Sequence, residues 1–512
     1  MDPSLTFTPD PVEYLIIGSG FGGAVTALRL SEAGLPSVLL ERGRRWPLTP
    51  YQDTFSSLTN PDGRSAWLSD VALLGDPKPI DRFVGVLELT VGDGIVAFAG
   101  AGVGGGSLVY AGALVQPPES LFRRIFGTGV DYGEMDDVHY PRVRSVMQPE
   151  PIPLAVLARP EYAAARAWVQ LGREAGLPTE LIDMGIDWRI VEAELAGRRV
   201  PSVIAGDFWY GNNSGAKLSL DRNYLRRAEA TGLLTLETQQ NVASIQEGPD
   251  GRYLVTADEI ADDGTVLRTR RYLARRLFLG AGSLGTSKLL VRSRARGWLP
   301  RLNDRVGSAW GNNGDFFSAI SGLPSRVRPN LGGTAPILVR DLDNPILPTG
   351  VECFADWARE GSSGVVASVG MAPVPAKGTF RYDEASDSVR LVWPGSDPDV
   401  ARAVRAGELT YARLAAGDRS RRPHRVEPVA ARAFGSGGAE PAPVDAAATA
   451  HPLGGVPLDA ATDNIGTVRG YPGLYVMDGA LVPGHAGCSN PALTIAALAE
   501  RNIERILERD LG

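Results

Sequence analysis

The chain has 512 residues, 44% of them hydrophobic and 22% charged, which is enough apolar material for two or three folded domains. The 52 Lys and Arg residues against 59 Asp and Glu residues give a net charge of −7, which excludes a general attraction to nucleic acid or anionic membranes. The two cysteines, Cys353 and Cys488, exclude a disulfide framework and lack the spacing of metal ligands. We therefore predict no metal site and interpret both as small buried side chains.

The N-terminal residues 1–13 are polar and lack the basic and apolar regions of a secretory signal. No run of eighteen apolar residues occurs in the chain. We therefore expect a cytoplasmic protein without a transmembrane segment.

The first legible element is a strand–glycine turn–helix unit. The apolar run 14–17 predicts a buried strand, and the turn after it carries Gly18, Gly20 and Gly23 before a helical pattern begins. In such a turn the first glycine permits the tight bend, the second lets a pyrophosphate approach the backbone, and the third allows close helix packing. Glu41, eighteen residues after Gly23, ends a second predicted strand where a carboxylate binds the adenosine ribose hydroxyls. The pattern predicts a dinucleotide site but leaves FAD and NAD open, and a glycine turn without a ligand is the alternative.

The rest of the chain alternates helical, strand-like and irregular segments. Residues 92–112 contain so much glycine that we predict neither helix nor strand there, but a loop that lets backbone approach a ligand. A second tight turn is predicted at 280–282. Helices are predicted at 162–175, 223–231 and 492–507, strands at 37–41, 233–246, 253–258, 266–279 and 474–478, and a Gly/Pro/Ala linker at 435–446.

Seven sequence motifs occur in the same order as in one known family. The chain resembles the glucose-methanol-choline (GMC) oxidoreductases, and within them is similar to the bacterial cholesterol oxidases that hold FAD non-covalently. The motifs are Ile17 to Gly23, Gly102 to Val109, Tyr210 to Asn213, Phe278 to Gly285, His451 to Gly455, Asp478-Gly479 and Ala499 to Asn502.

The resemblance implies an α/β fold in which two discontinuous domains interleave. A Rossmann-like FAD-binding domain is expected to comprise residues 10–46, 90–116, 218–308 and 465–512. A substrate-binding domain of a β-sheet with helices is expected to comprise residues 47–89, 117–217 and 309–464.

The resemblance also implies one non-covalent FAD and the residues around it. The expected cofactor-binding residues are Gly18, Gly20, Phe21, Gly22, Gly23, Glu41, Gly102, Gly105, Gly106, Ser107, Tyr110, Gly112, Val242, Gly282, Asp478, Gly479 and Asn490. Tyr110 stands where cholesterol oxidases usually have an asparagine, so the surroundings of the flavin are expected to differ.

Two residues are expected to act on the alcohol oxygen. By resemblance, the His451 imidazole binds the substrate oxygen as base or hydrogen-bond partner. Such a group is needed because the hydroxyl proton of the alcohol must leave while a hydride passes from its carbon to flavin N5. Asn490 is expected to stabilise developing charge, and capping a helix that begins near Ala492 is its alternative role. His485 is a rival for the second polar role.

Glu352 is the candidate for a proton shuttle. Cholesterol oxidases use a glutamate to move a double bond, and Glu352 lies among apolar residues whose burial would raise its pKa. An edge-strand carboxylate that faces water is the alternative. Residues 323–370, expected to line the substrate cavity, match the relatives poorly.

Together, these residues and the expected cofactor predict an alcohol-oxidising enzyme. The chain is expected to oxidise a hydrophobic secondary alcohol, such as a sterol, terpenoid or polyketide, to a ketone, and a double-bond isomerisation is a further option. Oxygen or another acceptor would reoxidise the FAD. The alternatives are a non-redox flavin-containing lyase or isomerase and a catalytically silent flavin protein.

Overall fold

The structure is a computed structural model that describes residues 9–72, 74, 78–355, 361–416, 424–428 and 447–511. The predicted linker at 435–446 lies outside these residues.

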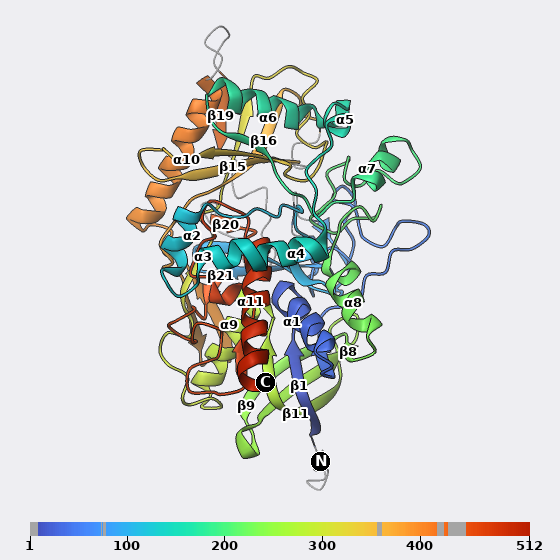
Figure 1. The fold of residues 1–512 in the computed structure, drawn as a ribbon. Coiled ribbons are helices and arrows are strands. Elements are labelled where there is room, and N and C mark those ends of the chain that lie inside the picture. Colours follow the sequence, from blue (N-terminus) through green and yellow to red (C-terminus); the bar gives the residue numbers. More distant parts are fainter. Residues whose placement is uncertain are drawn as a thin grey trace.

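A seven-stranded sheet carries the glycine turns (Figure 1). Its path runs β8-β2-β1-β11-β10-β9, and β22 also pairs with β11. The pairings among β8, β2, β1, β11 and β22 are parallel, whereas β10 pairs antiparallel with β11 and β9. The strands are β1 (Asp10–Ile17), β2 (Ser37–Leu40), β8 (Leu234–Glu237), β9 (Gln240–Glu247), β10 (Tyr253–Ile260), β11 (Val266–Leu279) and β22 (Leu474–Val476).

This sheet confirms the predicted strands except one. The single strand predicted at 233–246 is wrong, because the chain turns between β8 and β9. Gln239 lies in that turn with a φ of +57°, a left-handed conformation outside the β region.

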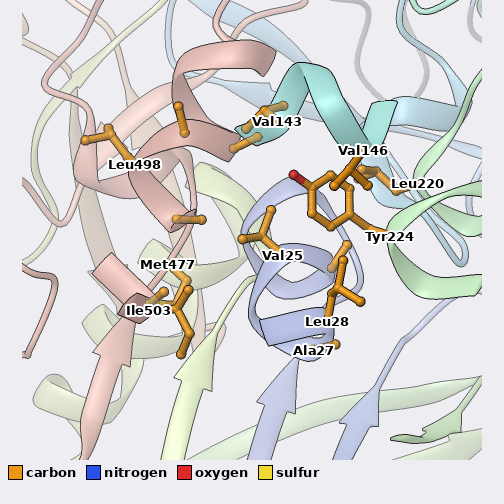
Figure 2. Packing of buried hydrophobic residues seen from close by; sticks show 14 of the residues in the cluster. Val25, Ala27, Leu28, Val143, Val146, Leu220, Tyr224, Met477, Leu498 and Ile503 are labelled. Carbon is orange, nitrogen blue, oxygen red and sulfur yellow. The ribbon is translucent and has the colours of Figure 1, made fainter. Parts of the chain in front are cut away.

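Helices cover both faces of the seven-stranded sheet. Successive side chains of β1 point to opposite faces, so Ile16 packs in one apolar cluster and Leu15 and Ile17 in another. The cluster with Ile16 is covered by helices that Figure 2 shows meeting over the sheet. These are α1 (Phe21–Glu32), α4 (Tyr140–Met147), α8 (Tyr224–Ala230) and α11 (Ala492–Leu511), while α9 (Gly282–Ala295) contributes to the other cluster. Among the described residues no helix has the length and apolar character to cross a membrane.

A six-stranded antiparallel sheet lies toward the opposite end of the molecule, at the top of Figure 1. Its order is β19-β13-β16-β15-β14-β7, and α6 (Ala163–Glu174) and α10 (Pro398–Ala416) pack against it. The strands are β7 (Thr179–Leu181), β13 (Phe316–Ser321), β14 (Ile337–Asp341), β15 (Thr349–Phe354), β16 (Val365–Met371) and β19 (Arg425–Pro428).

Short sheets connect these two layers. A three-stranded sheet joins β20 to β6 and β5, and a two-stranded sheet joins β12 to β21. β20 also contacts β13 of the six-stranded sheet, and β21 contacts α9, which covers the seven-stranded sheet, so the loop between β20 and β21 lies near both layers. Two further pairs are β3 with β4 and β17 with β18. The strands are β3 (Val71–Ala72), β4 (Lys78–Pro79), β5 (Leu87–Gly92), β6 (Ile95–Gly100), β12 (Ser308–Gly311), β17 (Thr379–Asp383), β18 (Ser388–Val392), β20 (Ala447–Thr449) and β21 (Leu453–Gly455).

The remaining helices are α2 (Glu119–Phe126), α3 (Tyr132–Glu134), α5 (Leu154–Leu157) and α7 (Trp188–Leu195). The prediction that residues 92–112 contain no regular element is wrong in part. The apolar run Ile95–Phe98 forms most of β6, and a short 3-10 helix covers Gly105–Leu108. The glycines on both sides of β6 form turns, and the apolar side chains between them are buried in the sheet.

Candidate active site

A cavity of about 490 Å³ is lined by residues of both sheets. The seven-stranded sheet contributes Ile17 and Leu40 with the turns that follow them, and the six-stranded sheet contributes Phe317, Glu352 and Val369. The glycine turns and three of the four candidate catalytic residues, Glu352, His451 and Asn490, therefore line one cavity.

The glycine turns leave room for an anionic group. Gly18 has a φ of +88°, and a Cβ there would lie 2.5 Å from the Gly280 carbonyl oxygen, so both the turn and its packing require glycine. Helix α1 begins after Gly20 without a side-chain cap, which leaves its first N–H groups available to a phosphate. Among the described residues, no heavy atom beyond the chain neighbours and the local helix backbone lies within 4 Å of a Cβ built on Gly106 or Gly282. These residues fit the close approach of a pyrophosphate.

Glu41 lines the cavity, but its carboxylate already accepts hydrogen bonds from the protein. Its Oε2 accepts from the Ser19 N–H at 3.0 Å and the Ser19 hydroxyl at 2.6 Å, and its Oε1 accepts from the N–H groups of Gly43 and Gly102 at 2.9 and 3.3 Å. The predicted bond to ribose hydroxyls therefore requires the Ser19 hydroxyl to rotate away, while the backbone donors can stay.

Four expected cofactor-binding residues do not line the cavity. Gly23 packs against the Gly18 carbonyl, and Gly102 packs against Trp46. The Ser107 hydroxyl bonds within the protein, donating to the Gly104 carbonyl at 2.7 Å and accepting from the Leu220 N–H at 2.9 Å. The Gly112 carbonyl accepts from the Gly185 N–H at 2.7 Å. The expected residues that do line the cavity are Gly18, Gly20, Phe21, Gly22, Glu41, Gly105, Gly106, Tyr110, Val242, Gly282, Asp478, Gly479 and Asn490.

Asp478 joins the C-terminal segment to the start of α9. Its Oδ2 accepts from the Gly282 N–H at 2.8 Å and the Thr286 hydroxyl at 2.5 Å, and its Oδ1 accepts from the Ala480 N–H at 2.8 Å. Burial raises the pKa of Asp478 to about 6, although these hydrogen bonds act in the opposite direction. The carboxyl group thus fixes the second glycine turn against the loop after β22.

His451 lies on the loop between β20 and β21 and faces the cavity. Its Nδ1 lies 2.8 Å from Oδ1 of Asp315, which precedes β13 and whose side chain is fully buried. Burial acts to lower the pKa of His451, but the charge and hydrogen bond of Asp315, together with the charge of Glu352, outweigh it and raise the pKa. Sequence reasoning did not identify Asp315, and the polar run Asn312-Asn313-Gly314 before it is a weak signal for a functional residue.

Glu352 and Asn490 meet in the same part of the cavity. The Asn490 amide donates to Oε2 of Glu352 at 3.2 Å. Glu352 is fully buried on β15, and this desolvation raises its pKa to about 7 against the opposing Asn490 bond. The alternative of a water-facing carboxylate is therefore wrong.

Two acceptor atoms of this pair remain free. Within the described part of the chain, neither Oε1 of Glu352 nor Oδ1 of Asn490 has a hydrogen-bond partner. Asn490 therefore does not cap α11, and the two buried acceptors are available to a donor such as a substrate hydroxyl.

His485 does not line the cavity, so its expected role at the alcohol oxygen does not fit the structure. Its Nδ1 accepts from the Gly487 N–H at 3.2 Å, and burial lowers its pKa to about 4, assisted by the charge of Arg124. Cys488, in the same loop, has a φ of +58°. Cys353 and Cys488 are buried, as predicted.

Aromatic side chains form much of the cavity wall near Glu352. Phe98, Phe208, Trp209, Phe317 and Phe354 all line it. The pairs Phe98–Trp209 and Phe208–Trp209 have ring centroids 5.3 and 5.1 Å apart. The sequence did not reveal this wall, because its members come from four distant segments. Its surface suits an apolar molecule.

Tyr110 lines the cavity, and its side chain is held by contacts with other residues of the protein. Its ring lies 5.8 Å from that of Phe21 in an edge-on arrangement, and Nζ of Lys217 lies 5.8 Å from its centroid. Burial raises the pKa of the Tyr110 hydroxyl, which donates to the Leu218 carbonyl at 3.4 Å. The phenol is thus neutral and aimed into the protein.

A sheet whose parallel strands end in open glycine turns, joined to an apolar pocket that holds a histidine and an asparagine, is typical of a nucleotide-dependent alcohol oxidoreductase. Sequence models of the N- and C-terminal parts of GMC oxidoreductase match residues 12–297 and 375–499. The chain therefore belongs to the GMC oxidoreductase family, and it is an FAD-dependent alcohol oxidoreductase.

Individual relatives agree with this assignment. The chain is 28% identical to a cholesterol oxidase of Mycobacterium tuberculosis over 96% of its own length and 90% of that protein. It is 26% identical to a cholesterol oxidase of Acinetobacter baumannii over 60% of this chain and 55% of that one. The solved structure of pyridoxine 4-oxidase from Mesorbium loti matches with a TM-score of 0.65 at 16% identity, covering 98% of this chain and all of that one.

Proposed function

We propose that this protein oxidises a hydrophobic secondary alcohol of the sterol type to a ketone and passes the electrons to oxygen or another acceptor. The observation that carries the proposal is the meeting of His451, Asn490 and Glu352 in one cavity with an aromatic wall. Two of the similar proteins are named cholesterol oxidases, which supports a sterol among the hydrophobic alcohols. Bound FAD would accept the hydride of the alcohol carbon at N5.

Each polar side chain has a distinct role in this proposal. His451 receives the hydroxyl proton, because its Nδ1 is held by Asp315 and its other nitrogen is left for the substrate. Asn490 lies beside the same pocket, where its amide can stabilise negative charge that develops on the oxygen. The aromatic wall excludes water and orients the apolar body of the alcohol.

A flavin titration tests the proposed reaction directly. We expect an anaerobic mixture of the purified protein with a saturated 3-hydroxysteroid to lose the flavin absorbance near 450 nm as the hydride is transferred. A control with the corresponding 3-ketosteroid leaves the absorbance unchanged. If an alcohol is converted to product while the flavin stays oxidised, the reaction is instead that of a non-redox lyase or isomerase.

The FAD of this protein is expected to be non-covalent. A covalent link needs a nucleophilic side chain such as histidine or cysteine at the cavity wall. Of the four histidines and two cysteines, His451 alone lines the cavity, and the proposal uses it at the alcohol. Denaturation followed by filtration should therefore release all flavin, and flavin that stays with the polypeptide would contradict this expectation.

Replacement of Asn490 by Ala tests the charge-stabilising role. Loss of one donor to a developing oxyanion costs about 2.7 to 4 kcal/mol, so we expect kcat to fall by about a hundred- to a thousandfold. Asn502, a buried asparagine on α11 outside the cavity, provides the control, and Asn502→Ala should retain normal kcat in the folded fraction. Equal losses in both variants would assign Asn490 to stability alone.

Double-bond isomerisation is a second candidate activity, because Glu352 lies in the cavity. Its raised pKa lets the carboxyl group exchange a proton near neutral pH, and its free Oε1 is available to a substrate carbon acid. Migration of an alkene next to a new ketone needs one group that removes a proton and returns it. Glu352 fits that role.

A further inference from the structure

Asp315 is the buried partner of His451, although it does not line the cavity itself. We propose that Asp315 is a positioning residue for the oxidation, which keeps a proton on Nδ1 of His451 and so presents the unprotonated Nε2 to the alcohol. This inference rests on the proposed function of His451 and extends it to a residue that touches neither substrate nor cofactor.

The surroundings of Asp315 fix its orientation. Its Oδ2 accepts from the Thr449 hydroxyl at 2.7 Å and the Ala450 N–H at 3.2 Å, which leaves Oδ1 for the imidazole at 2.8 Å. The Thr449 hydroxyl also accepts from the His451 N–H at 2.9 Å. Carboxylate, hydroxyl and imidazole thus form a closed hydrogen-bonded unit that holds the ring in one orientation.

This geometry selects one tautomer of the imidazole. An ionised carboxylate can only accept, so the nitrogen facing Asp315 must carry a proton. In the neutral imidazole the other nitrogen is then an acceptor, which is the form that a base for a hydroxyl proton needs. Once His451 takes that proton, the nearby carboxylate stabilises the imidazolium.

Two carboxyl groups act on His451, one from the residue before β13 and one from β15. Asp315 contacts the ring from the start of β13, and the Glu352 charge acts on it from β15. Both raise the pKa of His451, while burial lowers it. Glu352 is itself influenced by His451, by Arg340 on β14 and by Asp315. Removal of the Asp315 charge should therefore lower the pKa of His451 and leave the Glu352 charge in place.

The replacement Asp315→Asn separates positioning from simple structural support. The amide is similar in size but can turn its NH₂ toward Nδ1, which stabilises the wrong tautomer. We expect kcat/KM in the FAD-loaded enzyme to fall by a hundred- to ten-thousandfold, as an aspartate-to-asparagine change beside a catalytic histidine does. The acidic limb of its pH profile should move to lower pH, because a base with a lowered pKa stays unprotonated in more acidic solution.

A buried aspartate elsewhere in the same sheet provides the matched control. Asp341 on β14 bonds to Thr410 and Arg413 and does not line the cavity. We expect Asp341→Asn to lower the melting temperature without moving the acidic limb. In a His451→Ala background, Asp315→Asn should cause no further loss of rate. An unmoved limb in Asp315→Asn, or a further loss in the double variant, would overturn the proposal.

A measurement without substrate distinguishes failure of this inference from failure of the proposed function. The chain has four histidines, so ¹⁵N-histidine labelling of the FAD-loaded protein gives few signals, and His451→Ala identifies the one from His451. We expect this signal to show Nδ1 protonated and to titrate at lower pH in Asp315→Asn. A tautomer or titration unaffected by Asp315→Asn would refute the positioning role even if the alcohol oxidation is confirmed.

Discussion

Replacement of His451 by Ala is expected to reduce alcohol oxidation by a hundred- to ten-thousandfold while FAD remains bound. The imidazole faces the cavity and is oriented by Asp315, so its loss removes the proton acceptor but none of the glycine turns that fit the pyrophosphate. Stopped-flow measurement of flavin reduction isolates this step from reoxidation. The flavin absorbance of the purified variant reports whether the cofactor is retained.

His485 provides the control for this experiment. It is a histidine of the same C-terminal region, but its ring does not line the cavity. His485→Ala should therefore reduce the flavin at a rate close to that of the unaltered protein. If His485→Ala were the slow variant and His451→Ala the normal one, the roles of the two residues would have to be exchanged.

The replacement Glu352→Gln is expected to abolish alkene migration and to spare alcohol oxidation. The amide keeps the shape of the side chain but cannot remove and return a proton, so migration should slow by a hundredfold or more. Oxidation of a saturated alcohol needs only the proton that His451 accepts. Product analysis with a saturated and an unsaturated 3-hydroxysteroid measures the two activities separately.

A second buried glutamate tests whether the loss of any buried carboxylate would cause the selective loss of alkene migration expected for Glu352→Gln. Glu194 accepts hydrogen bonds from three backbone N–H groups, of Ser202, Val203 and Ile204, and does not line the cavity. Glu194→Gln should leave the ratio of isomerisation to oxidation unchanged. Equal losses of alcohol oxidation and alkene migration in Glu352→Gln would show that the carboxyl group supports the active site in general and has no specific role in alkene migration.

The sequence predicted the nucleotide half of the fold well, because its signals are local. The glycine turns at Gly18 and Gly280 follow apolar strands directly, and period and spacing within a short segment suffice to recognise them. The prediction missed the strand that contains residues 95–98, because the glycines on both sides of this short apolar run favour a loop. The strand predicted at 233–246 is interrupted at Gln239, and a glutamine gives no sign in the sequence that its φ is positive.

The substrate half could be predicted only in part, because it depends on contacts between distant segments. Asp315 lies 136 residues before His451, and the bond between Asn490 and Glu352 spans 138 residues. Resemblance to a family supplied His451, Asn490 and Glu352 as candidates, but Asp315 and the aromatic wall emerge only when the strands are assembled. His485 shows the converse, since a histidine close to Asn490 in the sequence does not line the cavity.

Several segments that complete the fold and the candidate site lie after residue 446, and this order affects how the chain folds during its synthesis. Residues 447–511 supply β20, β21, β22 and α11, together with His451 and Asn490. Until they leave the ribosome, the β11 edge that β22 covers is unpaired and the apolar face of α1 lacks α11. A nascent chain that contains both glycine turns but not residues 447–511 therefore lacks His451 and Asn490 and exposes apolar surface, so its yield should depend on protection by chaperones until these residues have been translated.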